Sequence, residues 1–203
     1  MVKQAPGYLT DLKINWKDYV QYLTRIEVEP KTQLLKQGDV ADKLFVIEKG
    51  GLRMGFEKDN KDITLQFFFE NEMLTSVESM FSGIPSTYFI ETIERCVIYI
   101  LTKENMELMG QKVPEMAQLT QNILISRLTY YATHLNEYIS ESPEERFNSL
   151  LANKPFIFMR APQRHIASYL GITNVSLSRI KARKSIFDEV PKEKKKGESV
   201  ETN

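Results

Sequence analysis

Short apolar runs alternate with turn residues along the first hundred positions of the chain. Seven runs are rich in β-branched and aromatic residues: TRIEV, TQLL, KLFVIE, LRMGFE, ITLQFFF, TYFIETI and CVIYIL. Turn signals lie between them, including QGD, GG, EKDNKD and SGIPS. Regular short strands with such breaks indicate a β-sandwich or barrel rather than βαβ units. The preceding stretch, TDLKINWKDYVQYL, has helical spacing and predicts a short leading helix.

After Leu101 the pattern becomes helical. KENMELMGQKV predicts a short helix that ends near Pro114, and residues 115–139 contain no Gly or Pro, which predicts one long helix from Pro114. One apolar stripe along it repeats every three or four residues: Leu124, Leu128, Tyr131, Leu135 and Tyr138. A second stripe includes Leu119, Ile123 and Tyr130. An amphipathic helix lying on its own sheet is one interpretation. Two stripes favour the other, a helix that also pairs with a second copy, so we expect the first stripe to be a dimer interface.

Two further helices and a turn are predicted near the C-terminus. SESPEER has the composition of a helix start and predicts a helix through Leu151. Pro162 can open the next helix, and Gly171 stands where a helix ends in a left-handed residue. Thr173 is then the expected N-cap of a second helix whose Leu177 and Ile180 face inward. Helix, short Gly-containing turn and helix form the helix-turn-helix pattern.

Charge changes the picture of this C-terminal segment. Residues 154–187 contain seven Lys or Arg and no Asp or Glu, whereas residues 1–153 hold 16 basic and 22 acidic residues. A basic segment on an acidic body predicts a polyanion partner for one end of the molecule. The residues predicted to contact DNA are Arg164, Thr173, Asn174, Val175, Ser176, Ser178, Arg179, Lys181, Arg183 and Lys184. Asn and Arg side chains can pair with base edges, and hydroxyl and Lys side chains suit phosphates. The alternative is an ordinary helical hairpin with a solvated basic face.

The remaining composition narrows the chemistry. No apolar run approaches the ~20 residues of a membrane span, and the N-terminus lacks the apolar core of a signal peptide, so we expect a cytoplasmic protein with no membrane partner. Cys96 is the one cysteine, and His134 and His165 are the two histidines, so neither a disulfide nor a metal site is expected. Cys96 is interpreted as a core residue, with a redox switch as the alternative. No paired catalytic residues stand out, so no catalytic site and no enzyme activity are predicted.

The order of β-rich domain, long helix and IASYLGITNVSLSRI resembles the Crp/Fnr family of bacterial transcription regulators, and LLKQGDVADKLFVIEKGGLRM adds to the likeness. The resemblance implies an α+β fold with an N-terminal cyclic-nucleotide-binding-like jelly roll, a dimerisation helix and a C-terminal winged helix-turn-helix. The corresponding domains are 1–113, 114–140 and 141–190, followed by a charged, disordered tail at 191–203. It places Asn174, Val175 and Arg179 at the bases, with Thr173 and Ser176 near the backbone. The implied partners are an operator DNA, a second copy of the chain and RNA polymerase.

The family's cyclic-nucleotide cassette contains a Gly-Glu pair and, further on, an Arg-Ser pair, of which the Arg neutralises the phosphate. Here Ser76-Val77 and Ser86-Thr87 stand near those positions, and no Lys or Arg occurs between Lys61 and Arg95. A phosphate pocket without a cation is costly, so we expect no cyclic-nucleotide response and assign no cofactor. Residues that could line an effector pocket are Thr75, Ser76, Glu78, Ser79, Ser86, Thr87 and Tyr131. The alternative for this stretch is a solvated loop.

The leading hypothesis for function is therefore a homodimeric, sequence-specific transcription regulator that does not respond to cyclic AMP. A second hypothesis is a small-molecule sensor whose C-terminal domain binds a protein partner instead of DNA. A third, a jelly-roll enzyme, has no metal cluster or nucleophile–base pair in the sequence to support it.

Overall fold

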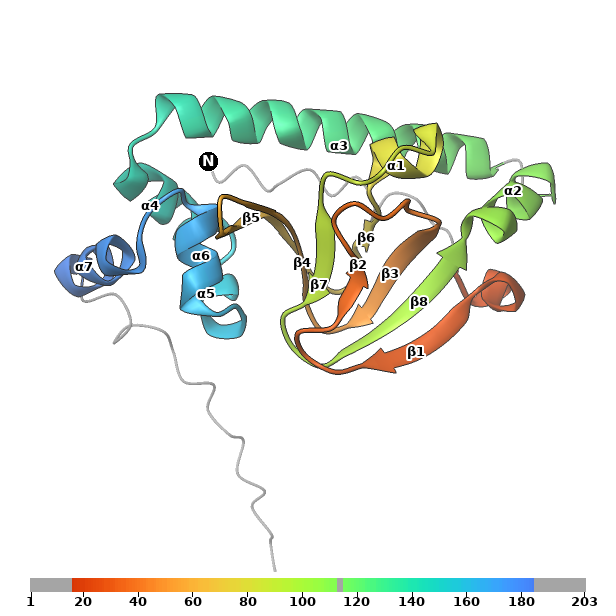
Figure 1. The fold of residues 1–203 in the computed structure, drawn as a ribbon, viewed down its shortest axis with the longest axis horizontal. Coiled ribbons are helices and arrows are strands. Elements are labelled where there is room, and N and C mark those ends of the chain that lie inside the picture. Colours follow the sequence, from red (N-terminus) through yellow and green to blue (C-terminus); the bar gives the residue numbers. More distant parts are fainter. Residues whose placement is uncertain (1–15, 113–114, 185–203) are drawn as a thin grey trace, which may run out of the picture.

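Two four-stranded antiparallel sheets face each other in the N-terminal half of the chain (Figure 1). The structure is a computed structural model that describes residues 16–112 and 115–184. One sheet has the strand order β1 (Thr24–Val28), β8 (Cys96–Thr102), β3 (Lys43–Lys49) and β6 (Met73–Leu74). The other has the order β2 (Gln33–Leu35), β7 (Phe89–Thr92), β4 (Leu52–Lys58) and β5 (Lys61–Phe68). These strands form the predicted jelly roll, which we call the β-roll.

The core between the two sheets is aliphatic and aromatic, because each strand turns alternate side chains inward. Its fully buried side chains include Leu52, Phe68, Ile90, Ile98 and Leu101. Cys96 is buried as well, with its Sγ 3.3 Å from the carbonyl of Gly51. Burial raises the pKa of Cys96 to about 11, so the thiolate is scarce at neutral pH. These observations favour the core interpretation of this cysteine over the redox switch.

Three short helical elements flank the β-roll. The predicted leading helix is the 3₁₀ helix η1 (Trp16–Tyr22), and the part of that prediction before residue 16 lies outside the described residues. Helix α1 (Val77–Ser82) connects β6 to β7, and α2 (Lys103–Lys112) follows β8. The sequence predicts α2 but neither β6 nor α1, because these two elements are too short for a period of 2.0 or 3.6 to be recognised.

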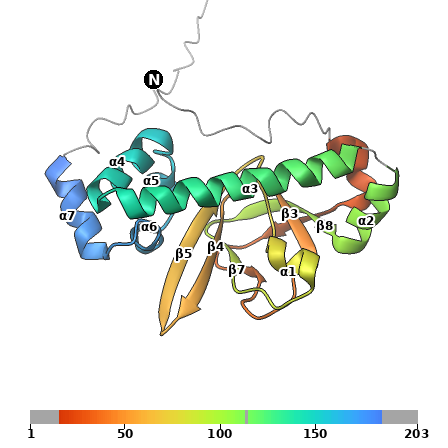
Figure 2. The same cartoon turned by 90° about the horizontal axis from the view of Figure 1, so that it is seen from above.

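Helix α3 (Glu115–Ser140) runs along the whole molecule on one side of the β-roll (Figure 2). It leads to four shorter helices at one end: α4 (Pro143–Asn153), α5 (Ile157–Arg160), α6 (Gln163–Tyr169) and α7 (Asn174–Lys184). The predicted helix start at Ser142 is confirmed, because Ser142 and Glu145 form a reciprocal capping box. In the described ranges, no helix combines the length and the apolar character that a bilayer crossing demands. The predicted wing and tail, residues 185–203, lie outside the described residues.

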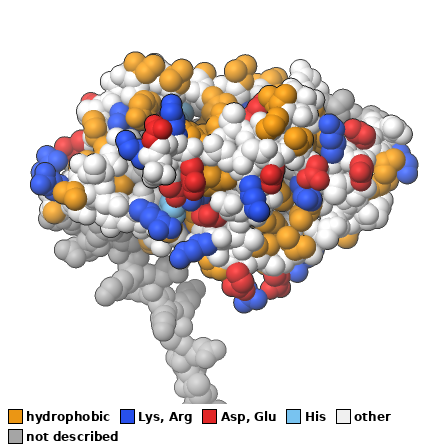
Figure 3. Space-filling view, in the orientation of Figure 1, with side chains coloured by type: hydrophobic (Ala, Val, Ile, Leu, Met, Phe, Trp, Pro, Cys, Tyr) orange, Lys and Arg blue, Asp and Glu red, His pale blue; other side chains and the backbone are white. Residues whose placement is uncertain are grey.

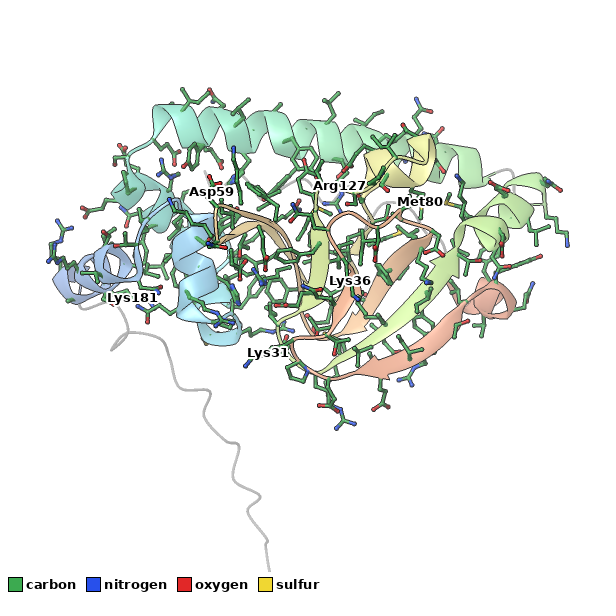
Figure 4. All side chains as sticks on the ribbon, in the orientation of Figure 1. Lys31, Lys36, Asp59, Met80, Arg127 and Lys181 are labelled. Carbon is green, nitrogen blue, oxygen red and sulfur yellow. The ribbon has the colours of Figure 1, made fainter. Side chains whose placement is uncertain are left out.

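The β4–β5 hairpin reaches from the β-roll to α6 (Figure 1). Its two turn residues, Asp59 and Asn60, have φ angles of 51° and 59°, the left-handed conformation that two-residue hairpin loops require. Figure 4 shows Asp59 at this tip, beside the C-terminal helices. The hydroxyl of Ser168 on α6 accepts a hydrogen bond from the backbone N–H of Thr64 at 3.0 Å and donates to the carbonyl of Asp62 at 3.1 Å. The hairpin therefore fixes α6 through backbone contacts.

The β-roll and the C-terminal helices share an apolar core. Phe67 and Phe69 belong to the same buried cluster as the interior residues of α4, α6 and α7. The ring centroids of Phe67 and Tyr169 are 5.5 Å apart, and those of Phe69 and Phe156 are 4.9 Å apart with an edge-to-face geometry. Aromatic pairs in this arrangement contribute about 0.5 to 1.5 kcal/mol beyond the area they bury. We call these contacts, which join the two halves of the molecule, the shared core.

An arginine of α5 closes the edge of the shared core. The Arg160 guanidinium lies 4.5 Å above the ring of Phe69 and donates to the carboxylates of Glu70 and Glu94 at 2.7 and 2.9 Å. This pairing lowers the pKa of Glu70 to about 2. We call Arg160, Glu70 and Glu94 the interdomain clamp.

Candidate nucleic-acid interface

The predicted helix-turn-helix consists of α6, a turn at Gly171 and α7. Gly171 has a φ of 69°, the left-handed conformation expected of it, and a Cβ atom there would lie 2.7 Å from the hydroxyl of Tyr138. Glycine is thus required both by the backbone and by the approach of α3. Leu177 and Ile180 of α7 are buried against Ile166 of α6, so one face of α7 is fixed to the protein.

The start of α7 is capped by hydroxyl groups. The Oγ1 of Thr173 accepts a hydrogen bond from the backbone N–H of Ser176 at 3.1 Å, which confirms Thr173 as the N-cap. The hydroxyls of Thr173 and Ser176 also lie 3.0 Å apart. Two of the residues predicted near the DNA backbone therefore hold the first turn of α7 in place.

The opposite face of α7 is exposed along its length. Asn174, Val175, Ser178, Arg179 and Ala182 line one open depression on this face, and all five are exposed. Their spacing places them together on the side of the helix away from Leu177 and Ile180. We call these five residues the reading face. It includes four of the residues predicted to contact DNA.

The polar groups of the reading face differ in their availability. Among the described residues, no hydrogen-bond or ion-pair partner is found for the side chains of Asn174 and Arg179. The hydroxyl of Ser178 instead accepts a hydrogen bond from Nε2 of Gln163 at 2.8 Å. Gln163 precedes Arg164 in the first turn of α6 and is not among the predicted site residues. Its amide is a further polar group beside the reading face, and only the contact between two helices reveals it.

The other cations predicted to contact DNA lie outside the reading face and differ in their local contacts. Arg164 is exposed and donates to Nε2 of His165 at 3.3 Å. Lys181 lies 5.5 Å from the centre of the Phe158 ring, and Arg183 lies 3.6 Å from Glu144. The side chain of Lys184 lies outside the described residues, although its backbone ends α7. Figure 3 shows Lys and Arg side chains at the end of the molecule occupied by α7, as well as elsewhere on this face.

His165 lies beneath this surface and is buried. Its Nδ1 is 3.8 Å from a carboxylate oxygen of Asp62, yet burial and the nearby Arg53 lower the pKa of His165 to about 4. The ring is therefore neutral at physiological pH. No group of three or more His, Cys, Asp or Glu that could hold a metal ion is found in the part of the chain that the structure describes.

Helix α3 has one face on the protein and another in solvent. On the inner face, the ring of His134 stacks between Tyr130 and Tyr169, with centroid distances of 5.6 and 5.1 Å. On the outer face, Leu128 and Leu135 are 71% and 60% exposed. Leu124, Tyr131 and Tyr138 of the same predicted stripe are also exposed, and Figure 3 shows hydrophobic side chains along this edge of the molecule. Exposed Leu residues in a row along a helix indicate a surface for a partner.

Three of the predicted effector-pocket residues, Ser76, Glu78 and Ser86, are linked by hydrogen bonds, and we call them, together with the nearby Ser79, the hydroxyl cluster. The hydroxyls of Ser76 and Ser86 are 2.7 Å apart, and that of Ser76 donates to Glu78 at 2.8 Å. The hydroxyl of Ser79 donates to the carbonyl of Ile84 and accepts from the N–H of Ala41 at 2.9 Å.

The alternative interpretation of this stretch, a solvated loop, is wrong for most of it. Ser76, Ser79, Ser86 and Thr75 are all buried, and the hydroxyl of Thr75 donates to the carbonyl of Lys43 at 2.9 Å. Among the Ser and Thr residues of this predicted set, Thr87 alone is exposed. Tyr131 approaches from α3, with its hydroxyl 4.0 Å from the sulfur of Met54.

Comparison with known proteins gives these features a context. Residues 25–112 match the family model described as "Cyclic nucleotide-binding domain". A search of the curated proteins finds no match. The c-di-GMP responsive global regulator CLP from Xanthomonas campestris is similar with a TM-score of 0.68 at 15% identity, covering 85% of this chain and 91% of that one. For FixK2 from Bradyrhizobium japonicum the TM-score is 0.70 at 14% identity, covering 82% and 86%.

A cyclic nucleotide-binding domain containing protein from Listeria monocytogenes gives a TM-score of 0.60 at 19% identity, covering 90% of this chain and 89% of that one. Each of these likenesses covers more than four fifths of the chain and so extends well beyond residues 25–112. The chain has the Crp/Fnr fold. The α+β architecture predicted from the sequence is thereby confirmed.

Within this Crp/Fnr fold, one cation approaches the β-roll from outside the cassette. Arg127 of α3 lies between that helix and the β-roll (Figure 4). Its Nη2 donates to the carbonyl of Met73 at 2.5 Å, and its guanidinium lies 4.5 Å above the ring of Phe68. Burial lowers the pKa of Arg127. The stretch between Lys61 and Arg95 contains no cation, and Arg127 could not be predicted here because the fold brings it from a distant helix.

Proposed function

We propose that this protein is a homodimeric, sequence-specific DNA-binding transcription regulator that does not respond to cyclic AMP. The observation that carries the proposal is the reading face of α7, where Asn174 and Arg179 are exposed without a partner among the described residues. An unpaired guanidinium and an amide on a helix fixed from behind match the bidentate contacts that Arg makes to guanine and Asn to adenine.

Charge supports the same partner. The segment 154–187 has no acidic residue, so a polyanion meets little repulsion there. The cations around the reading face are spaced along two helices, as expected for phosphate contacts that orient a recognition helix in the major groove. We also propose that the protein contacts RNA polymerase, and this part of the proposal rests only on the likeness to known regulators.

Selection of bound duplexes from randomised DNA tests the proposal. We expect one enriched sequence made of two related half-sites, about one helical turn apart, because a twofold dimer presents two reading faces. Affinity for that duplex should fall steeply between two salt concentrations, since phosphate contacts release counterions. Absence of any enriched sequence, together with a flat salt response, would contradict the proposal and favour a C-terminal domain that binds a protein.

The dimer is proposed from the outer stripe of α3. Leu128→Asp or Leu135→Asp should dissociate the dimer, because a carboxylate would replace a packed leucine in a repeating seam. Light scattering at micromolar concentration measures the mass, and operator binding should weaken together with dimerisation. Thr133→Asp is the matched control, since Thr133 is exposed on the same helix but points away from the stripe. A wild-type protein that is monomeric at micromolar concentration would contradict a homodimer.

The absence of a cyclic-AMP response is proposed from the hydroxyl cluster. At the cassette positions, the hydroxyl of Ser86 donates to that of Ser76, which in turn donates to Glu78. Arg127 is engaged by the carbonyl of Met73 and the ring of Phe68. A cyclic phosphate would have to displace these bonds before any cation could neutralise its charge, and a buried unneutralised phosphate is costly.

A further inference from the structure

Val175 is the one aliphatic side chain with a large exposed area on the described part of the recognition helix. It is 60% exposed, between Asn174 and Ser176 in the first turn of α7. A single exposed valine is ordinary on a protein surface. This one, however, lines the open depression of the reading face together with Arg179 and Ala182, so it lies where the proposed DNA would be.

The residues around Val175 limit which base pairs it can contact. Arg179 lies one turn further along the helix on the same side, about 6 Å from Val175 along the axis. The hydroxyl of Ser178, which could serve the same base pair, accepts a hydrogen bond from Gln163 and can still offer DNA its O–H. Base pairs in B-DNA follow each other at about 3.4 Å. Val175 and Arg179 therefore face base pairs one or two steps apart. The other polar side chains beside Val175 on the reading face are those of Asn174 and Ser178.

The major groove offers a valine one specific contact. Guanine, adenine and cytosine present donors and acceptors at their edges, which a valine cannot satisfy and would desolvate without compensation. Thymine presents its C5-methyl group, and burying that methyl against an aliphatic side chain is favourable. We propose that Val175 is a specificity-determining residue that selects a thymine, by its 5-methyl group, one or two base pairs from the guanine contacted by Arg179. This inference rests on the proposed function and names the base chemistry that its reading face recognises.

The test uses the full-length protein and the duplex enriched by selection. Each thymine of a half-site is replaced in turn by uracil, which removes the 5-methyl group and leaves the hydrogen-bonding edge unchanged. We expect one position at which uracil weakens binding about threefold to tenfold, in line with the loss of one buried methyl contact per half-site. At that position, 5-methylcytosine in a C·G pair should bind better than cytosine.

A variant assigns the methyl contact to Val175. In Val175→Ala the affinities for thymine and uracil at that position should become equal, whereas Val40→Ala, at an exposed valine of the β-roll outside the reading face, should keep the wild-type ratio. Melting temperatures of both variants check that they fold, which is expected because both side chains are exposed. The inference is overturned if no thymine is sensitive to uracil, or if the sensitivity persists in Val175→Ala. If the wild-type protein enriches no duplex at all, the proposed function fails instead.

Discussion

The hydroxyl cluster and the reading face are both rich in small polar residues, yet they differ in what those residues bind. In the hydroxyl cluster, Ser76, Ser79 and Ser86 are buried and their hydroxyls bond to each other, to Glu78 or to backbone groups. On the reading face, Asn174 and Arg179 are exposed, and no partner for them is found among the described residues. The residue types predicted a ligand at both the hydroxyl cluster and the reading face, and the hydrogen bonds of their side chains distinguish the two sites. A buried polar group that is already satisfied stabilises the fold, and an exposed unsatisfied one is available to a partner.

The largest effect is expected from removing one bond of the hydroxyl cluster. Ser79→Ala leaves the buried N–H of Ala41 without an acceptor and should lower the free energy of unfolding by about 2 to 3 kcal/mol. Urea denaturation measures this loss, and affinity for DNA should be unchanged under conditions where the variant is folded. Ser82→Ala is the matched control, because Ser82 belongs to the same helix and is exposed. Equal stabilities of the two variants would mean that the cluster is not structural.

A change on the reading face should lower the affinity for DNA and leave the stability of the fold unchanged. Arg179→Ala should reduce the free energy of binding to the selected duplex by ~1 to 3 kcal/mol and relax preference at one base pair per half-site, because a bidentate contact to guanine is lost. The unfolding transition should stay where it is, since Arg179 is exposed. Titrations of operator and scrambled duplex measure the two affinities. Arg183→Ala, as control, should weaken both duplexes alike. If Arg179→Ala does so too, it contacts the backbone.

The interdomain clamp is an intermediate case, satisfied but partly exposed. Arg160→Gln should lower the free energy of unfolding by about 1 kcal/mol at pH 7, a modest value because water screens the pair. Arg25→Gln, which removes the more exposed pair with Glu48, is the control and should cost less.

Acid titration sharpens this prediction. The folded pKa of Glu70 is depressed from 4.5 to about 2, so its contribution is full above pH 4.5 and is lost as the pH falls through 2. The difference in stability between wild type and Arg160→Gln should therefore shrink between pH 5 and pH 2. A difference independent of pH would show that Arg160 acts by packing on Phe69 rather than by charge.

The smallest effect is expected from cyclic AMP itself. A ligand that binds the folded state raises the melting temperature by mass action. Because we expect no binding, micromolar cyclic AMP should leave the melting temperature unchanged. Thermal melting at increasing nucleotide concentration is the measurement. A saturable rise would contradict the proposal and would make Arg127 the first candidate for the cation that neutralises the phosphate.

Much of the fold could be predicted because its signals are local. Each of the seven apolar runs contains a strand, and the cap at Ser142, the left-handed Gly171 and the N-cap Thr173 follow from residues within a few positions of each other. Elements of one or two turns, such as α1 and α5, were not predicted, because so few residues show no period.

The bonding of the candidate sites could not be predicted, because it depends on contacts between distant segments. Arg127 reaches Met73 across 54 positions, and Gln163 reaches Ser178 from a neighbouring helix. The sequence also identified the hydroxyls of Ser76 and Ser86 without showing that they face each other. The roles of the predicted DNA, dimer and effector residues stay predictions that the experiments above address.

The shared core has a consequence for the order in which the chain is synthesised. Phe67 and Phe69 emerge from the ribosome well before the helices that cover them, because their partners Tyr169 and Phe156 lie near the C-terminus. At bacterial or eukaryotic elongation rates of about 5 to 20 residues per second, this leaves two phenylalanines of a nearly finished β-roll uncovered for several seconds. A nascent chain in that interval presents an aromatic patch that chaperones recognise, and a gene truncated after α3 would make that exposure permanent.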